Sequence, residues 1–489
     1  MPAASRPPRA SRSALPAAAR VLAALGLLVG LSLVVTLPSG YNSDSLYVYA
    51  QAKDLLAFGS LRGWTFSAIP FTVPDLIAAA PIAAIVPGPR AYYVVAAPLQ
   101  MVLLGAALSW WLARTQQRPL DRTLLSFAVA AALIVLLIGA AFYPSGYFAA
   151  QPLFILNYHG FAAICATLLT VVACEDDFRL LRQHWAATLI AVAVLTASDF
   201  YFAAYFGAIL TAALLLSRSR ALLRLVLAVG GVSVAVFALS YWLNPSLGLH
   251  IRESNAIVAE LRPAHAAARL AALMIVPTAL VLALRFRGAL SRRSLILYMA
   301  LLLIAAALAA AGLIKDWSGF RYLTILLPVS LVLMLDLVNA MPPRRQAVLL
   351  AIAAAGLGAA LLLVGLKPSS PLSSYRDEIA CIDAADRPGS TIVATYWPAK
   401  LIFEGTGRRH NLIQVNADLQ PWDWISNRRW RSLHPEGRTT FVVTEHLSMQ
   451  TLAHLTNDTD ARAICGGKLL QIDRPPAELG ILKGTAPGE

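Results

Sequence analysis

Residues 21–38 read VLAALGLLVGLSLVVTLP, and residues 40–59 read GYNSDSLYVYAQAKDLLAFG. The first stretch is an uncharged apolar run of 18 residues, long enough to cross a bilayer as a helix. The second stretch places acidic and aromatic residues directly after this run in the sequence. Together they predict a first membrane span followed by a helix lying on the membrane surface.

The predicted surface helix ends at Gly59, because glycine is a common helix stop. Its apolar residues recur at helical spacing, and they are Leu46, Tyr49, Ala52, Leu55 and Leu56. Lys53 and Asp54 fall elsewhere on the helix and are expected on a solvated face. Asp44 has two interpretations from its position alone. It caps the helix, or it is a general base at a cleft at membrane level.

The composition of the chain is that of a membrane protein. Of its 489 residues, 58% are hydrophobic and only 13% are charged, whereas soluble domains carry about 25% charged residues. Residues 1–366 hold 26 Lys and Arg against 12 Asp and Glu, while residues 367–489 hold 14 of each. The net charge of +14 therefore belongs to the membrane part, where the positive-inside rule explains it. Nucleic-acid binding is not expected.

Residues 1–20 carry four Arg and no acidic residue, and we interpret them as a cytoplasmic basic tail. A cleaved signal peptide is the alternative, but the apolar run is long for one and lacks a small-residue cleavage site. We expect a transmembrane domain over residues 21–366, with an outer loop at 39–90 that carries interfacial helices. Eleven spans are predicted, at 21–38, 91–112, 123–143, 160–174, 185–197, 200–216, 225–243, 270–284, 294–312, 322–341 and 347–366.

This register puts 18 of the 26 basic residues of the membrane part on one side, as the positive-inside rule requires of the cytoplasm. Leu76–Val86 is too short to span and is flanked by prolines, so we expect a re-entrant or interfacial helix on the outer face. An odd number of spans puts the C-terminus outside. The protein is thus expected in the inner (plasma) membrane, with an extracytoplasmic C-terminal domain.

Residues 367–489 have the composition of a soluble domain. Strand-like and helix-like segments alternate, which favours an α/β domain with a largely parallel sheet. The segment WDWISNRRW (422–430) is predicted to be a helix, and the aromatic residues around it are expected either to bind carbohydrate or to dock on the membrane part. Cys381 and Cys465 are expected to form a disulfide in an oxidising compartment.

Four further polar residues of the predicted outer face are candidates for binding. Lys315 and Arg321 are basic residues at the outer end of two spans, and they suit the phosphate of a lipid-linked ligand or anchor the helices at the interface. His159 titrates near neutral pH, or it is a plain interfacial residue. Asp199 lies between two spans, where it caps a helix or serves a site.

The order of features resembles the GT-C fold of membrane glycosyltransferases, in particular protein O-mannosyltransferases and aminoarabinose transferases. The motif reads Asp44-Ser-Leu-Tyr47, then AKDLLAFG (52–59), IPFTVPDLIAAAPIAAIV (69–86) and PGPRAYY (87–93). It covers about fifty residues, whereas the layout covers most of the chain. Where that family carries a second acidic residue in the second outer loop, this chain has LNYHG (156–160). Asp75 is the substitute, and Asp199 the next choice.

The resemblance implies transfer of a sugar from a polyprenyl-phosphate donor to a glycan, lipid or protein acceptor on the outer face. Asp44 and Asp75 would be the catalytic carboxylates, and Lys315 and Arg321 would hold the leaving phosphate. Tyr47 belongs to the motif and is expected at the substrate. No cofactor or metal ligand set is assigned, although carboxylates are compatible with a divalent cation. The alternatives are a lipid or polysaccharide transporter and a non-catalytic scaffold that presents the C-terminal domain.

Overall fold

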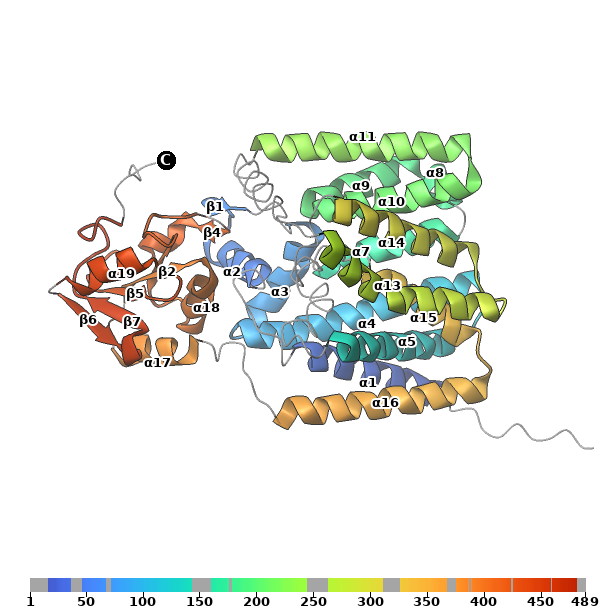
Figure 1. The fold of residues 1–489 in the computed structure, drawn as a ribbon, viewed down its shortest axis with the longest axis horizontal. Helices are drawn as coiled ribbons and strands as arrows, with labels where there is room; N and C mark the ends of the chain where they lie inside the picture. Colours follow the sequence, from blue (N-terminus) through green and yellow to red (C-terminus); the bar gives the residue numbers. More distant parts are fainter. Residues whose placement is uncertain are drawn as a thin grey trace, which may run out of the picture.

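A computed structural model describes residues 16–36, 46–66, 72–142, 160–175, 178–243, 263–310, 326–366, 375–385, 387, 389–423, 425–458 and 460–481. The chain forms a helical bundle and a C-terminal α/β domain, which sits at one end of the bundle (Figure 1). The described segments of the first loop, residues 46–66 and 72–85, lie between the two parts.

The bundle is built from apolar helices and is embedded in a membrane. Seven of the helices within the described ranges are long and apolar enough to cross it. They are α1 (Ala17–Thr36), α4 (Pro89–Thr115), α5 (Leu120–Phe142), α10 (Phe200–Ser217), α11 (Arg220–Leu243), α14 (Arg292–Ala310) and α16 (Pro343–Leu366).

The prediction of eleven spans is therefore corrected to seven, although each of the eleven predicted segments contains a helix within its described residues. The other four correspond to α7 (Gly160–Glu175), α9 (Trp185–Ser198), α13 (Pro263–Phe286) and α15 (Leu326–Asn339). Of these, α9 and α15 have 14 residues each, and 14 residues of α-helix rise only about 21 Å. A short helix, α8 (Arg179–Gln183), links α7 to α9.

Small residues allow the first helices to pack closely. α1 contacts α4, α5 and α16. A Cβ atom at Gly105 of α4 would lie 2.9 Å from the Phe127 ring and 3.0 Å from Leu28. One at Gly356 of α16 would lie 2.7 Å from Leu136. Without a hydrophobic driving force in lipid, such close backbone approach is a main source of helix association.

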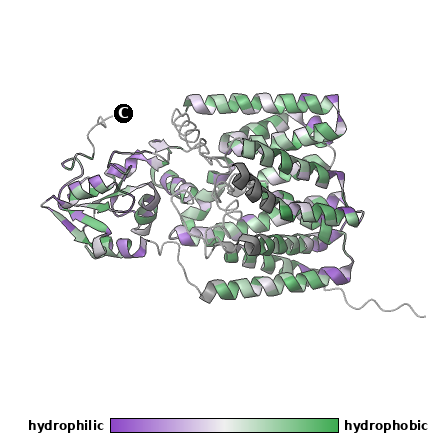
Figure 2. Cartoon of the chain, in the orientation of Figure 1, coloured by the Kyte–Doolittle hydropathy of each residue, from purple (hydrophilic) through white to green (hydrophobic). Residues whose placement is uncertain are grey.

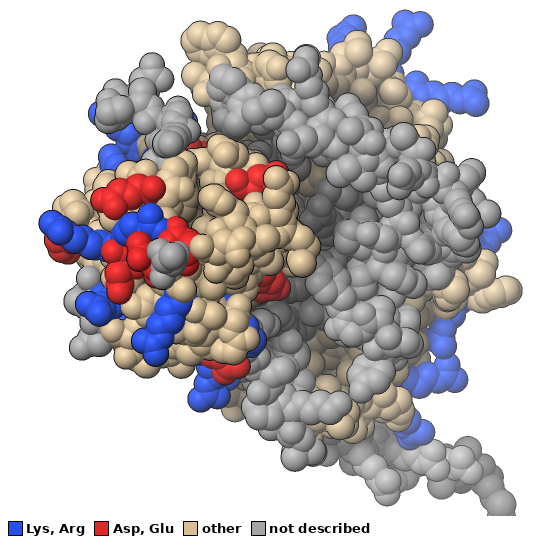
Figure 3. Space-filling view, turned by 60° about the vertical axis from the view of Figure 1, so that its left-hand side comes forward, with Lys and Arg blue, Asp and Glu red and all other residues tan. Residues whose placement is uncertain are grey.

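The end of the bundle remote from the C-terminal domain carries basic residues. Hydrophilic residues mark the helix ends remote from the C-terminal domain (Figure 2). In Figure 3, the charged side chains visible at that end are basic, whereas both signs mix on the C-terminal domain. Arg20 pairs there with Asp121, and Arg293 pairs with Asp336, which also accepts a hydrogen bond from Ser294.

The first loop forms a compact layer on the opposite end. It contains α2 (Tyr47–Phe58), β1 (Trp64–Thr65), the π-helical turn η1 (Thr72–Leu76) and α3 (Ile77–Ile85). Gly59 ends α2 with a φ of 65°, which confirms the predicted stop. α3 has only nine residues, in keeping with a segment that does not span. Lys53 donates a hydrogen bond to the Ala83 carbonyl at 3.2 Å and so ties α2 to α3.

The C-terminal domain is an α/β unit with one five-stranded sheet in the order β3-β2-β5-β7-β6. The strands are β2 (Thr391–Thr395), β3 (Asn411–Val415), β5 (Thr440–Val443), β6 (Ala461–Ile464) and β7 (Leu469–Ile472). The helices around it are α17 (Arg376–Ala384), α18 (Tyr396–Gly405) and α19 (Met449–Thr456).

The sheet is mixed, which corrects the expectation of a largely parallel one. β3, β2 and β5 are parallel, but β7 pairs antiparallel with both β5 and β6. Only the short turn containing η8 (Cys465–Gly467) joins β6 to β7, and a connection of that length cannot make a parallel crossover. The expected helix at 422–430 is also absent, since β4 (Ser426–Asn427) and the 3₁₀ helix η7 (Arg428–Ser432) occupy its second half.

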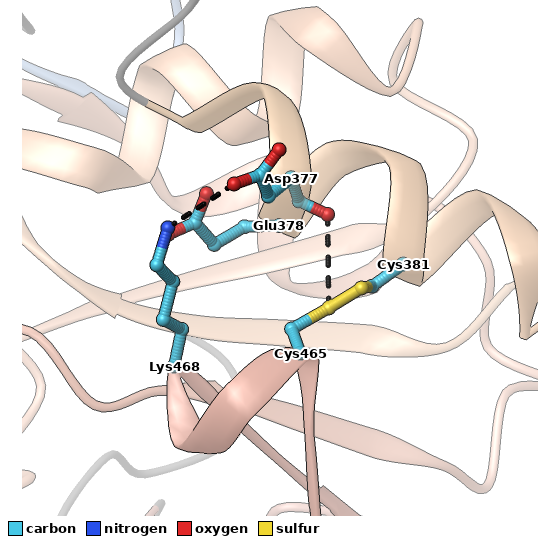
Figure 4. The surroundings of a disulfide bond; sticks show 5 residues. All are labelled: Asp377, Glu378, Cys381, Cys465 and Lys468. Atoms are coloured by element: carbon cyan, nitrogen blue, oxygen red, sulfur yellow. Dashed lines mark hydrogen bonds and ion pairs between the residues drawn. A yellow bond between two sulfur atoms is a disulfide. The ribbon is translucent and has the colours of Figure 1, made fainter.

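A disulfide closes the domain at this turn (Figure 4). It joins Cys381 of α17 to Cys465, with Cα atoms 6.2 Å apart, and it is the pairing predicted from the sequence. Lys468 reaches Asp377 and Glu378 of α17 at 3.4 Å each. These carboxylates raise the pKa of Lys468. Two kinds of contact thus hold α17 against the β6–β7 turn.

Candidate functional site

The residues expected to form a site divide into two groups. Asp44, His159, Lys315 and Arg321 lie outside the described residues, so their roles stay predictions. Tyr47, Asp75 and Asp199 lie within them, in or beside the layer formed by the first loop.

Asp75 is a buried carboxylate at the base of this layer. Its side chain is on η1 and is only 2% exposed. η1 contacts α2 and α3 of the layer and also α7 and α9 of the bundle. Because an ionisable group is costly to bury near lipid, a carboxylate at the junction of these elements is a functional candidate.

Asp199 is the N-cap of α10. Its Oδ1 atom accepts a hydrogen bond from the Tyr201 backbone N–H at 2.9 Å, and the side chain is 6% exposed. The capping interpretation of the sequence is therefore confirmed for this residue. Asp199 directly follows α9, and α9 contacts η1, the turn that carries Asp75.

Tyr47 is a core residue in this structure. It is 1% exposed, and its ring centroid lies 5.6 Å from that of Trp64. Tyr49 and Tyr92 are likewise buried, with ring centroids 5.3 Å apart. Aromatic packing thus joins α2 to β1 and to the start of α4.

Asp54 was expected on a solvated face, and the structure shows the opposite. It is fully buried between α2 and the C-terminal domain. Its carboxylate accepts hydrogen bonds from Arg408 at 2.6 Å, from the Asn427 amide at 2.6 Å and from the Trp430 indole at 3.1 and 3.0 Å. Arg408 also donates to Glu404. We call these five residues the interdomain cluster.

The charges of the interdomain cluster support one another. Burial alone would lower the pKa of Arg408, but Glu404 and Asp54 outweigh it and raise the pKa above its ordinary value. Burial, together with the nearby Glu404, raises the pKa of the Tyr49 phenol as well. A buried guanidinium with two carboxylates and further hydrogen-bond donors meets the requirement for holding charge inside a protein.

Backbone pairing completes the contact between the two parts. β1 pairs antiparallel with β4, so that Trp64 faces Asn427 and Thr65 faces Ser426. The Arg428 N–H donates to the Gly63 carbonyl at 2.9 Å. The segment around Trp430 thus docks on the first loop, which is one of the two roles expected for it. Local spacing contains no signal for this contact, because the apolar face expected for the helix includes Tyr49 and Ala52 and places Asp54 elsewhere.

Within the described ranges, no group of three or more His, Cys, Asp or Glu side chains is placed to hold a metal ion. Comparison of the chain with protein-family models, with curated proteins and with solved structures finds no match.

Proposed function

We propose that the protein is an integral membrane glycosyltransferase that moves a sugar from a polyprenyl-phosphate donor to an acceptor of the cell envelope. The observation that carries the proposal is the layer formed by the first loop. This layer follows the first span, holds the buried Asp75, and is covered by the C-terminal domain through the interdomain cluster. The same order of elements underlies the resemblance to GT-C glycosyltransferases.

In this proposal the reaction takes place where the layer meets the bundle. Asp44 removes the proton from the acceptor hydroxyl while its oxygen attacks the anomeric carbon. The bond from that carbon to the phosphate oxygen breaks, and Lys315 and Arg321 stabilise the charge on the departing polyprenyl phosphate. Asp75 is the second carboxylate. His159 is expected at the same face from its place in the sequence, and Asp199 caps the start of α10.

The proposal includes a topology. Helices α7, α9, α13 and α15 enter or cross the membrane together with the other seven. The N-terminus is cytoplasmic, in accord with the basic helix ends, and the C-terminal domain lies outside the cell's inner membrane. The disulfide between Cys381 and Cys465 supports an oxidising compartment for this domain.

The test is made with the full chain in lipid nanodiscs and a panel of polyprenyl-phosphate sugars. Wild type is expected to release polyprenyl phosphate, with and without EDTA to measure metal dependence. Asp44→Asn and Asp75→Asn are expected to reduce turnover by about a hundredfold or more, as loss of acid–base catalysis does. Asp418→Asn, a change at an exposed turn, is the matched control and should be active.

Mass spectrometry of envelope glycans from the corresponding strains extends the test to the cell. If the strain without the protein loses a sugar and the Asp44→Asn strain keeps it at the normal level, Asp44 is not the base. A transporter would instead move a labelled lipid-linked sugar across a proteoliposome without consuming it. A scaffold would do neither.

A further inference from the structure

An aromatic cluster lies on the C-terminal domain away from the docking contact. The ring centroid of Tyr396 is 5.0 Å from that of Trp397 and 5.7 Å from that of Trp422. Trp397 is 40% exposed and Trp422 is 38% exposed, while Tyr396 is buried between them and the domain core. The Lys400 ammonium, also buried, lies 4.4 Å from the centre of the Tyr396 ring. The buried Tyr396 ring thus supports two indoles that are partly exposed to solvent.

The cluster sits at the carboxyl edge of the parallel part of the sheet. Trp397 follows β2 directly, and Trp422 belongs to the loop after β3, where it pairs with Gln414 through the backbone at 2.9 Å. The loop after β5 joins them, because the Thr395 hydroxyl donates to the Glu445 carbonyl at 3.1 Å. The start of α18 and the loops after β3 and β5, which all follow parallel strands, therefore meet here.

The same edge is a topological switch point. β2 and β5 are neighbours, but the helices that follow them cover opposite faces of the sheet. α18 packs through Phe403 on the face that carries Ile392, and α19 packs through Leu455 on the face that carries Val393. In open α/β sheets, ligands bind outside the carboxyl ends of the strands at such a point.

The polar residues at the cluster restrict the kind of ligand. Glu445 and His446 have side chains that are about half exposed, and the imidazole Nε2 lies 3.2 Å from the Glu445 carboxylate. Glu445 belongs to the loop whose backbone contacts Thr395, two residues before Trp397, and its half-exposed carboxylate disfavours an anionic ligand such as a phosphate at this edge. It suits hydroxyl groups, which donate hydrogen bonds to it, and aromatic rings suit the C–H faces of a pyranose.

We propose that Trp397, Trp422 and Glu445 form a binding site for a neutral glycan. Sugar rings stack on the two indoles, and their hydroxyls donate to Glu445. The docking contact leaves this site open, because Trp397 is at the start of α18 and Arg408 lies just beyond its end, about 15 Å along the helix. The site does not depend on the proposed transferase activity, since it needs no lipid-linked donor.

The experiment uses the full chain in nanodiscs and isothermal titration with neutral hexasaccharides: mannohexaose, cellohexaose, chitohexaose and an arabinan hexamer. At least one of them is expected to bind. Trp397→Ala, Trp422→Ala and Glu445→Gln are each expected to weaken that binding by about tenfold or more, as the loss of a main contact does. Trp242→Ala removes an indole that is 74% exposed on α11 and is the matched control, with unchanged affinity.

Two results would overturn the site. One is the absence of binding to every hexasaccharide, or binding that the three variants leave unchanged. The other is contact of the indoles with lipid, seen as stronger fluorescence quenching by brominated lipids in wild type than in Trp397→Ala or Trp422→Ala. Binding is measured without a lipid-linked sugar donor. Failure of the glycan site can therefore be distinguished from failure of the proposed transferase activity.

Discussion

The Arg408 guanidinium lies 2.6 Å from the Asp54 carboxylate, although 354 positions of sequence separate the two residues. Asp54 is on the first helix after the first span, and Arg408 follows α18 of the C-terminal domain. The contact therefore fixes the C-terminal domain on the membrane part at the layer that carries Asp75.

Arg408→Ala is expected to loosen this attachment. The substitution leaves the carboxylates of Asp54 and Glu404 buried without their cation, which costs about 3–5 kcal/mol in comparable buried pairs. The thermal midpoint should fall, and hydrogen exchange should rise at the amides of α2 and of the residues around Trp430.

The neighbouring Arg409 provides the control. It pairs with Asp383 at 2.6 Å, but its side chain is 60% exposed. Arg409→Ala is expected to change stability by less than about 1 kcal/mol, because exposed ion pairs contribute little. Equal effects of the two variants would contradict the role given to the interdomain cluster.

Cys381→Ser is expected to destabilise the C-terminal domain by about 4.5 kcal/mol in the chain-entropy picture, since the disulfide closes a loop of 84 residues. Urea unfolding of the full chain in detergent, followed by fluorescence of the domain's tryptophans, measures the change. A reductant should shift wild type to the variant's midpoint and leave the variant where it is. If a reductant lowered the urea midpoint of both proteins, the change in wild type would not be due to the disulfide.

The sequence was sufficient for features that depend on neighbouring residues. The stop of α2 at Gly59 follows from the preference of glycine for the left-handed conformation. The helical state of the apolar segments is also local, because a backbone in lipid must pair its own polar groups. The sequence did not predict how many of these helices are long enough to span, because neighbouring helices can shelter a segment that is too short.

The features that the sequence did not predict are long-range. Asp54 and Lys53 are polar and adjacent, which is typical of a solvated helix face, yet Asp54 is covered by Asn427 and Trp430 from the far end of the chain. Strand β6 pairs antiparallel with β7, although its four residues, Ala461–Ile464, are partly exposed and do not alternate clearly between apolar and polar. Both depend on pairing that local periodicity does not encode.

The C-terminal domain is expected to lose stability in acid through His410. Its imidazole is buried, and Nδ1 lies 2.8 Å from the Ser390 hydroxyl. Burial and then the charge of Arg409 lower the pKa of His410 below the ordinary 6.5. The unfolded chain therefore binds a proton more readily, so stability is complete above about pH 6.5 and decreases as the pH falls towards the lowered value.

His410→Asn keeps a polar partner for Ser390 but cannot take up a proton. We expect the urea midpoint of wild type to fall more than that of the variant between about pH 7.5 and pH 5.5. Parallel decreases in the two proteins would assign the acid sensitivity to groups other than His410.

Gly105→Leu is expected to disrupt the packing of the first spans. Its Cβ atom alone would lie within 3.0 Å of Phe127 on α5 and of Leu28 on α1, and both of these side chains are fully buried. The added side chain must push the helices apart, and overpacking of this kind costs about 1–3 kcal/mol or more. Gly207→Leu is the control, because a Cβ atom at Gly207 meets nothing within 4 Å. The thermal aggregation temperature of the two variants in detergent measures the difference. If the Gly207 variant were as unstable as the Gly105 variant, the loss of stability would be due to leucine in a span and not to close packing at Gly105.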